Sequence, residues 1–279
     1  MVHKRIELKN HFAFLGEDGK NPTLDIYLPY NMAEMNRQNQ KRPCMVVCPG
    51  GGYGMCSERE SEPIALHFLP EGFNVFVLNY SVAPNRFPTQ IIEVASVIEL
   101  IYENYEIWNC DTSKIAIMGF SAGGHLAAHY STMFDCKEVR EAFPESKSVN
   151  ASVLCYPVIS ALETTAHMGS FLNLLGHKPE TEEEINYFSC DKNVKETTPP
   201  AFIWHTAEDG CVPVANSLLY AKALTEKNVP VELHIYPFGG HGLSTCDKHT
   251  IDDMTPIFSY NSVWLKSLKE WLKLIFKKR

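Results

Sequence analysis

Residues 119–123 read Gly119-Phe120-Ser121-Ala122-Gly123 and separate a predicted strand from a predicted helix. The strand is the apolar, partly β-branched run at 114–118, and the helix is the run of good helix formers at 124–130. A turn this tight leaves no room for side chains at its two glycines, and it lifts the serine hydroxyl out of the sheet. The sequence therefore predicts a sharp strand-to-helix turn with Ser121 at its apex.

Ser121 also begins the predicted helix, so free backbone N–H groups and the positive end of the helix dipole face its hydroxyl. The same pattern occurs in glycine-rich turns in which a serine only caps a helix. A strand before the pattern and a helix after it favour a nucleophile instead. We predict that Ser121 is that nucleophile and that the N–H of Ala122 stabilises the developing oxyanion.

Apolar runs of strand length alternate with segments of helical spacing along the chain. The predicted strands are residues 4–9, 23–28, 44–48, 73–80, 114–118, 151–156, 201–206 and 231–236; the main predicted helices are residues 60–70, a helix that follows Pro88 and ends near Trp108, 213–227 and 257–276. This alternation predicts a single α/β domain, residues 1–279, with a mostly parallel central sheet of about eight strands and helices on both faces. The partly alternating residues 23–28 are typical of a half-exposed edge strand.

The stretch from about 159 to 199 breaks this alternation with short helical segments at 168–175 and 182–187. An excursion of this length after a strand usually covers a binding site, so we expect a small lid. Its apolar side chains are mixed with His167 and Asn173. A lid of mixed polarity favours short acyl groups over long ones, because a long chain needs a larger apolar surface.

Ligands of such sheets bind beyond the carboxyl ends of the strands, and two further loops there carry candidate residues. A serine hydroxyl needs a base, and His241, in a glycine-flanked loop after the last predicted strand, is the predicted one. Asp209 is predicted to orient the imidazole and stabilise its charged form, with Glu208 as the nearest rival. The order Ser, Asp, His along the chain is the order found on this architecture.

The stretch Pro49-Gly50-Gly51-Gly52-Tyr53 follows the apolar strand at 44–48. Glycines at a strand end let the backbone approach a ligand closely and present N–H groups to it. We predict that the N–H groups of Gly51 and Gly52 complete the oxyanion hole begun by Ala122. Tyr53 is predicted to bind substrate because its ring and hydroxyl suit a sugar, although the position also suits a residue that only packs the loop.

Composition restricts the classes of function. The chain has 279 residues, of which 45% are hydrophobic and 21% charged, as in an ordinary globular protein. A net charge of -8 argues against a nucleic-acid partner. No apolar run has the length of a signal peptide or a membrane span, so we expect a cytoplasmic protein that acts on a small-molecule ester without a membrane.

Nine cysteines without a C-x-x-C pair favour free thiols in a reducing compartment. His125 and His129 have helical spacing, but no third ligand accompanies them. We therefore expect no metal and no cofactor, and the sequence leaves open whether the chain forms a homodimer.

The chain resembles the α/β-hydrolase superfamily along nearly its whole length, and most of all its esterase/lipase group with acetyl-xylan esterase-like and feruloyl-esterase-like carbohydrate esterases. The matching stretches are Leu24 to Pro29, Pro49 to Tyr53, Gly119 to Gly124, Glu208-Asp209 with Val212-Pro213, and Gly239 to Gly242. Pro49 stands where relatives of the hormone-sensitive lipase type carry a histidine. The resemblance implies a serine carboxylesterase that forms an acyl-enzyme and cleaves esters of small acids, acetyl first, with sugars or xylo-oligosaccharides among the candidate alcohols.

Two other functions stay open at this point. Related catalytic domains cleave peptides or amides, although those peptidases usually carry a large gating domain. A catalytically inactive binding protein can also use this fold, although such proteins usually lose the serine or the histidine.

Overall fold

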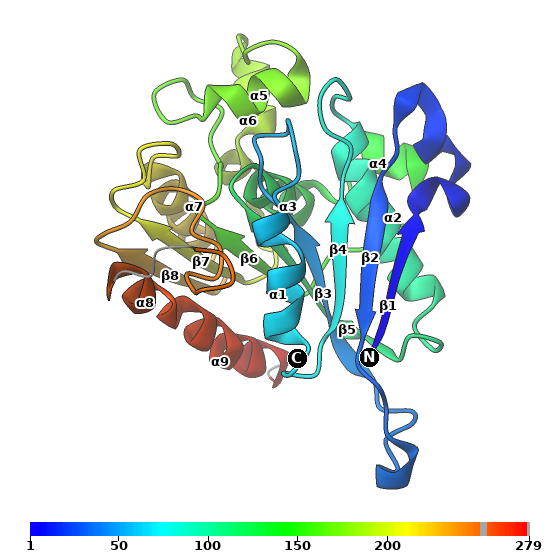
Figure 1. Ribbon diagram of the computed structural model, residues 1–279. Coiled ribbons are helices and arrows are strands. Elements are labelled where there is room, and N and C mark those ends of the chain that lie inside the picture. The colour runs from blue at the N-terminus through cyan, green and yellow to red at the C-terminus, as the bar shows by residue number, and fades with distance from the viewer. Residues whose placement is uncertain (252–255, 278–279) are drawn as a thin grey trace.

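The computed structural model describes residues 1–251 and 256–277. Its strands form one sheet in the order β1-β2-β4-β3-β5-β6-β7-β8 (Figure 1). β1 pairs antiparallel with β2 and β2 with β4, while the pairs from β4 to β8 are parallel, so the predicted mostly parallel sheet is confirmed. The strands are β1 (Val2–Glu7), β2 (Thr23–Leu28), β3 (Arg42–Cys48), β4 (Asn74–Asn79), β5 (Cys110–Phe120), β6 (Ala151–Cys155), β7 (Ala201–Thr206) and β8 (Val231–Tyr236).

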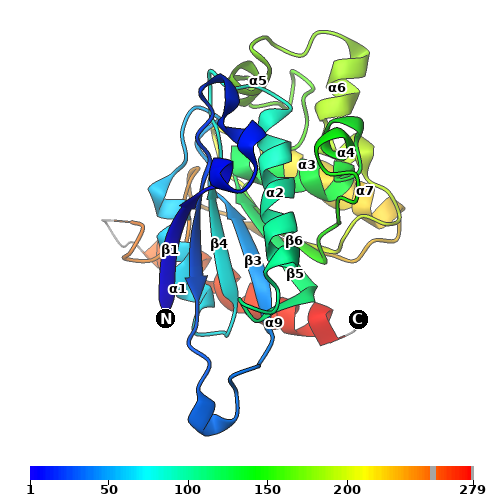
Figure 2. The same ribbon diagram turned by 90° about the vertical axis from the view of Figure 1, so that its right-hand side faces the viewer.

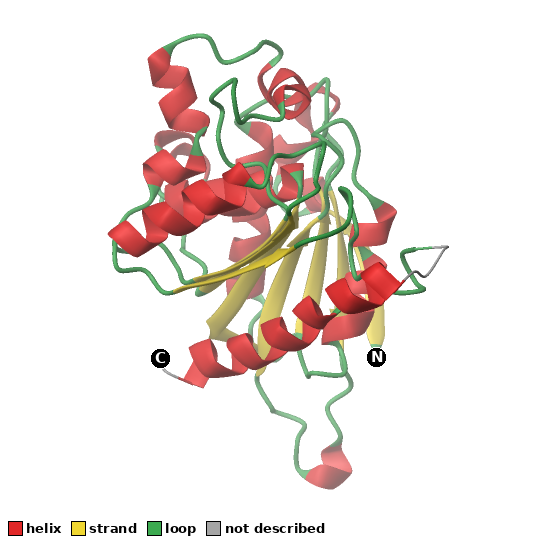
Figure 3. Cartoon of the chain, turned by 90° about the vertical axis from the view of Figure 1, so that its left-hand side faces the viewer, coloured by secondary structure: helices red, strands yellow, loops and turns green. Residues whose placement is uncertain are grey.

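Helices cover both faces of the sheet: α2 and α3 lie on one side, and α1 and α9 on the other (Figure 2). Figure 3 shows the same two layers of red helices above and below the yellow strands. The α-helices are α1 (Glu62–Phe68), α2 (Thr89–Glu103), α3 (Ala122–Met133), α4 (Lys137–Ala142), α5 (Met168–Leu175), α6 (Glu182–Phe188), α7 (Ala215–Glu226), α8 (Pro256–Asn261) and α9 (Val263–Lys277). Short 3-10 helices span Leu8–Asn10, Ala13–Gly19, Ala33–Met35, Glu58–Glu60 and Cys190–Asn193.

β3 shows why the central strands read as continuous apolar runs. Val46 packs in the core on the α2 and α3 side, while Met45 and Val47 pack in the core under α1 and α9. A parallel strand covered on both faces buries every side chain, so no polar alternation remains. The carboxyl ends of the parallel strands β3, β5, β6, β7 and β8 therefore lie along one edge of a sheet that is packed on both faces.

β2 is an interior strand, so the prediction of an edge strand at 23–28 was wrong; the edge is β1. The polar residue that suggested an edge is Asp25, which is only 3% exposed. Two nitrogens of Arg5 on β1 bind its carboxylate at 2.8 and 2.7 Å, and His3 binds it at 3.1 Å. A neighbouring strand therefore neutralises a charge that the local pattern assigned to solvent.

The single closing helix predicted at 257–276 is divided into α8 and α9. The hydroxyl of Ser262, between them, donates to the carbonyl of Ser259 at 2.8 Å, and the carbonyl of Ser262 accepts the amide of Leu265 at 3.1 Å. Serine side chains compete with helical backbone bonds in this way and favour a helix start. No helix within residues 1–251 and 256–277 has both the length and the apolar character needed to cross a membrane.

The segment between β6 and β7 carries α5 and α6, which lie together at the top of Figure 1, beyond the carboxyl ends of the parallel strands. α5 has the bounds expected from the sequence, and α6 extends one residue further than expected, to Phe188. Thr181 begins α6 with a capping box, in which its hydroxyl accepts the amide of Glu184. The segment therefore has helical structure of its own above the sheet.

Candidate active site

The turn predicted around Ser121 is present and sharply bent. Ser121 joins the end of β5 to the start of α3 with φ 54° and ψ -119°. A positive φ is costly for a residue with a side chain, and it is held here by the packing around it. A Cβ atom at Gly119 would collide with the carbonyl oxygen of Gly123, and one at Gly123 would collide with that of Cys48. The geometry therefore requires glycine at both positions.

Ser121, His241 and Asp209 form a continuous hydrogen-bonded chain. The Oγ of Ser121 lies 2.7 Å from Nε2 of His241, and Nδ1 of His241 lies 2.6 Å from Oδ2 of Asp209. A carboxylate only accepts hydrogen bonds, so Nδ1 carries the proton and Nε2 is free to accept the serine hydroxyl. This arrangement can remove a proton from Ser121.

Asp209 is held by neutral donors as well as by His241. Its Oδ1 accepts the amides of Cys211 and Val212, both at 2.9 Å, and its Oδ2 also accepts Nε2 of His205 at 3.1 Å. Burial would raise the pKa of Asp209, but the hydrogen bonds from His205 and His241 outweigh it and lower the pKa below its usual range. Asp209 is therefore an ionised carboxylate in a water-poor site.

The sequence did not single out His205, the second imidazole on Asp209. It is fully buried on β7, and Nδ1 lies 2.8 Å from Oγ of Ser217. Nε2 faces two acceptors, Asp209 and the carbonyl of Val212, so Nε2 donates and Nδ1 accepts the serine hydroxyl. The short spacing between His205, near the end of a strand, and Asp209, in the loop after it, was the one sequence feature that could have predicted this contact.

Glu208, the rival acid, faces another loop. Its Oε2 accepts the amide of Gly239 at 3.2 Å, and the residue is exposed. The structure therefore brings Asp209, and not Glu208, to His241.

The glycine loop after β3 lies against the serine turn. A Cβ atom at Gly50 would be 3.0 Å from Cβ of Ser121. Gly51 and Gly52 have φ values of 127° and 63°, which side chains avoid. Within the described residues, neither of their amides donates to a protein acceptor. The amide of Ala122 lies in the first turn of α3, where helix amides have no intrahelical partner.

The structure does not bring Tyr53 to the substrate side. Its side chain is 1% exposed, and its hydroxyl lies 2.8 Å from Nδ1 of His125. The other nitrogen of His125 lies 2.9 Å from the carbonyl of Phe188. The substrate-binding role predicted for Tyr53 is therefore not supported; a tyrosine in the core packs and orients the loop, because the apolar ring is buried and its hydroxyl is satisfied.

The segment that carries α5 touches the glycine loop directly. Nδ2 of Asn173 donates to the carbonyl of Gly52 at 2.8 Å, and the ring of His167 lies 4.0 Å from the Cβ position of Gly52. Nδ1 of His167 is bonded to Oγ of Ser170 at 2.9 Å. Burial and the neighbouring His241 lower the pKa of His167, so its ring is neutral near pH 7.

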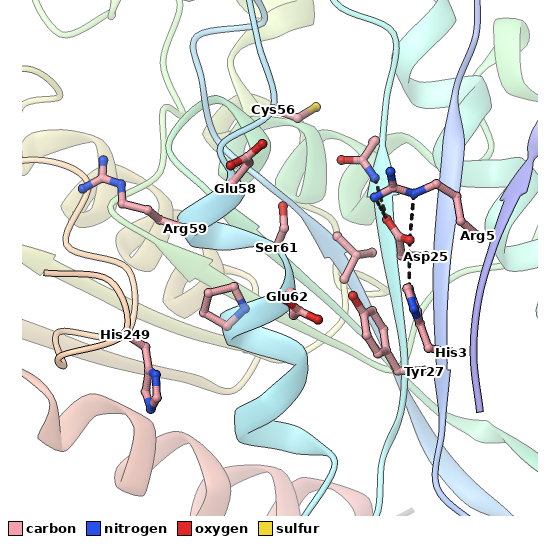
Figure 4. Close-up of a pocket in the computed structure, with 13 residues that line it drawn as sticks. His3, Arg5, Asp25, Tyr27, Cys56, Glu58, Arg59, Ser61, Glu62 and His249 are labelled. Carbon is pink, nitrogen blue, oxygen red and sulfur yellow. Dashed lines mark hydrogen bonds and ion pairs between the residues drawn. The ribbon is translucent and has the colours of Figure 1, made fainter. Parts of the chain in front are cut away.

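Two neighbouring hollows share Arg59 and His249 in their linings. The smaller, about 380 Å³, is lined by His241 and the loop after it, together with Arg59 and His249. The larger, about 820 Å³, shares Arg59 and His249 with it and extends across α1 to His3 and Tyr27 (Figure 4). No member of the Ser121, His241 and Asp209 set lines the larger hollow, so only the smaller one reaches the candidate triad.

In the part of the chain that the structure describes, no three histidine, cysteine or acidic side chains are grouped as a metal site would need. His125 and His129 lie in the core, and both nitrogens of His125 have partners. The cysteines are all free thiols, and most are buried.

A serine, an aspartate and a histidine in this chain order, at the strand ends of a sheet with this strand order, define an α/β-hydrolase fold. A comparison with family models narrows the class. The chain belongs to the BD-FAE family, whose model matches residues 24–224.

Individual proteins resemble the chain over most of its length. An acetylxylan esterase of Xylanibacter ruminicola is 31% identical over 94% of this chain and 50% of its own length. Endo-1,4-beta-xylanase B of Butyrivibrio fibrisolvens is 40% identical over 79% of this chain and 35% of its own length. The chain thus spans half or less of these relatives. The crystal structure of an acetyl ester-xyloside bifunctional hydrolase from Caldicellulosiruptor lactoaceticus is 36% identical, covers 98% of this chain and 96% of that chain, and has a TM-score of 0.83.

Proposed function

We propose that the chain is a carboxylic ester hydrolase that uses Ser121 as its nucleophile and forms an acyl-enzyme. The observation that carries the proposal is the unbroken hydrogen-bonded chain from Ser121 through His241 to the ionised Asp209. Among the relatives, the acetylxylan esterase and the acetyl ester-xyloside hydrolase support the same reaction class.

The proposed reaction has two similar halves. Oγ of Ser121 attacks the ester carbonyl carbon while Nε2 of His241 takes the hydroxyl proton. The carbonyl oxygen becomes an oxyanion that accepts hydrogen bonds from the amides of Gly51, Gly52 and Ala122. The C–O bond to the alcohol then breaks, His241 protonates the departing alcohol, and the acyl group stays on Ser121. Water, activated by His241, releases the acid in the same way.

The proposed acyl group is short, acetyl above all, and the proposed alcohol is a sugar such as an acetylated xylo-oligosaccharide. The segment at 159–199 serves as a lid over this site. Its contacts with Gly52 come from the polar side chains of Asn173, His167 and Ser170, which leaves little apolar surface for a long chain. The similarity to an acetylxylan esterase and to an acetyl ester-xyloside hydrolase supports the sugar half of the proposal.

Two measurements test this function. A fluorophosphonate probe should label Ser121 in the wild-type protein and fail to label Ser121→Ala, which would separate a hydrolase from an inactive binding protein. A series of p-nitrophenyl esters from acetyl to octanoyl, with aminoacyl anilides beside it, should give the highest kcat/KM for acetyl to butyryl esters. Higher turnover of the anilides would favour a peptidase, and activity on acetyl esters with none on acetylated xylo-oligosaccharides would overturn the sugar half.

A further inference from the structure

Glu60 is a buried carboxylate that the proposed reaction does not use. It ends the 3-10 turn between the glycine loop and α1 and is only 3% exposed. Its Oε2 accepts the amide of Gly50 at 2.7 Å, and its Oε1 accepts the hydroxyl of Tyr156 at 2.6 Å. Among the described residues, no lysine, arginine or histidine forms an ion pair with it. Burying a carboxylate without a cation is costly, so its contacts need an explanation.

The donors around Glu60 match the needs of its ionised form. The hydroxyl oxygen of Tyr156 accepts the amide of Ser244 at 2.9 Å, so the one hydroxyl proton of Tyr156 is directed to Glu60. The amide of Gly50 donates a second hydrogen, to the other oxygen, so a proton added to Glu60 would compete with one of these two hydrogen bonds. Burial raises the pKa of Glu60 above its usual value, and the hydrogen bonds from Tyr156 and Gly50 reduce that rise.

One side of this network fixes the glycine loop. Glu60 holds the amide of Gly50, and the carbonyl of Gly50 accepts the amide of Ser57 at 2.9 Å. In a trans peptide the C=O and the following N–H point in opposite directions. Anchoring the carbonyl of Gly50 therefore turns the N–H of Gly51 away from Ser57 and leaves it free for the oxyanion.

The other side fixes the loop of the base. Tyr156 packs edge-to-face on the ring of His241, with 5.0 Å between ring centroids. Its hydroxyl holds the amide of Ser244, three residues after His241, and the hydroxyl of Ser244 donates to the carbonyl of Arg59 at 2.5 Å. The turn that carries Glu60 is therefore bonded to the glycine loop and to the His241 loop at once.

We propose that Glu60 is a positioning residue, which acts through Tyr156 and Gly50 to hold the oxyanion donors and the His241 imidazole in one geometry. This inference rests on the proposed ester hydrolysis. The negative charge of Glu60 also favours the imidazolium that forms on His241 in the transition state.

Other charges act on the same imidazole. Asp209 lies 2.6 Å from it, the pKa of His167 is lowered partly by it, and Arg59 lies beside Gly242, next in the chain to His241. These groups are unchanged in a Glu60 variant, so a change in the pH profile of that variant reports on Glu60 itself.

Kinetics of Glu60→Gln, Glu60→Asp and Tyr156→Phe test the inference. Glu60→Gln keeps the shape but cannot accept both protons, so we expect kcat/KM to fall by about 10–100-fold, mostly in kcat. The acid limb of its pH profile should move to lower pH, because the charge that favours the imidazolium is lost. Glu60→Asp keeps the charge at a shorter reach, so it should lose rate without that movement. Tyr156→Phe should lower kcat/KM by about tenfold.

The matched controls are Glu93→Gln and Tyr130→Phe. Glu93 is also buried and accepts a backbone amide, that of Ser81 at 2.7 Å, while the hydroxyl of Tyr130 donates to the carbonyl of Lys147 at 2.8 Å. Neither group contacts the candidate triad, so kcat/KM of folded controls should stay within about threefold of wild type.

The affinity of a boronic-acid transition-state analogue should fall in parallel with kcat/KM across the Glu60 and Tyr156 variants, while KM changes little. A folded Glu60→Gln with wild-type kcat/KM and an unmoved acid limb would overturn the inference and leave the proposed hydrolysis intact. A wild-type protein that neither labels with fluorophosphonate nor cleaves esters would overturn both.

Discussion

Asp25 and Asp209 are both buried aspartates that hydrogen bonds hold below their usual pKa, yet only one of them lies in the candidate active site. Arg5 binds Asp25 through two nitrogens and carries its positive charge at every pH of interest. Asp209 is bound by two amides and two imidazoles. A permanent cation neutralises the first carboxylate, whereas neutral donors leave the charge of the second available to the imidazolium of His241. The surroundings of a buried acid, more than its burial, therefore separate the structural role of Asp25 from the catalytic role proposed for Asp209.

Removing the hydroxyl of Ser121, which is linked to Asp209 through His241, should give the largest loss of activity. Ser121→Ala is expected to lower kcat/KM for p-nitrophenyl acetate by about 10⁴-fold or more without loss of stability, because the hydroxyl makes no contact that the core needs. Ser131→Ala is the matched control, since that hydroxyl donates within α3 to the carbonyl of Ala127 at 2.7 Å. A folded Ser121→Ala protein with near wild-type activity would end the serine-hydrolase proposal.

Changing the charge of the acid itself is the next test. Asp209→Asn should lower kcat/KM by about 10³–10⁴-fold, since the amide favours the wrong tautomer of His241. Glu208→Gln changes an exposed carboxylate that accepts the amide of Gly239 and does not reach His241, so its effect should stay within about threefold. Steady-state kinetics of both variants decide the matter, and the reverse order of damage would make Glu208 the acid.

The contrast also explains what the sequence could predict. Ser121, Asp209 and His241 stand in loops directly after strands, and the register of a parallel sheet brings such loops together. The glycines at 119 and 123 are required by the turn itself, so a local pattern carried that information. The strands β2, β7 and β8 have the predicted bounds, because each is a short run of strand-forming residues that ends at a proline or a loop.

The features that could not be predicted from the sequence depend on contacts with residues far away in the chain. Tyr53 is buried because its hydroxyl meets His125, and Asp25 is interior because Arg5 lies on the neighbouring strand. His205 and Glu60 reach the site through side-chain contacts that no spacing specifies, apart from the short step between His205 and Asp209. In each case, hydrogen bonds to residues distant in sequence decided where the polar side chain lies, and the local sequence pattern does not contain them.

His205 is a neutral donor to Asp209, whereas Asp25 is bound by the cation Arg5, so a variant at His205 tests this difference. His205→Gln should lower kcat/KM by about 10–100-fold, the cost of weakening a hydrogen bond to a buried carboxylate. Ser217→Ala, which removes only the bond on the far nitrogen of His205, should do less. Kinetics of the two folded variants at pH 8 give the ranking, and a larger effect from Ser217 would show that His205 does not act through Asp209.

The pH dependence of the reaction should follow the base. His241 must be neutral to accept the proton of Ser121, so kcat/KM should fall about tenfold per pH unit on the acid side and reach a plateau near pH 8. Asp209 stays ionised throughout this range because its pKa is lowered. A profile that is flat from pH 5 to 8 would remove His241 from the role of base.

Asp25→Asn should give the smallest kinetic effect and a measurable effect on stability. The folded state lowers the pKa of Asp25, so its carboxylate stabilises the fold above the pKa of the unfolded chain, and this contribution is lost as the pH falls through the lower folded-state value. The variant should lose about 1–3 kcal/mol in the free energy of unfolding at pH 7 and less at pH 3, where the wild type has lost part of the same contribution. Urea denaturation at the two pH values measures this difference, with kcat/KM expected within about twofold of wild type. A loss of activity above tenfold in a folded Asp25→Asn protein would instead make the larger hollow, which Asp25 lines, part of the active site.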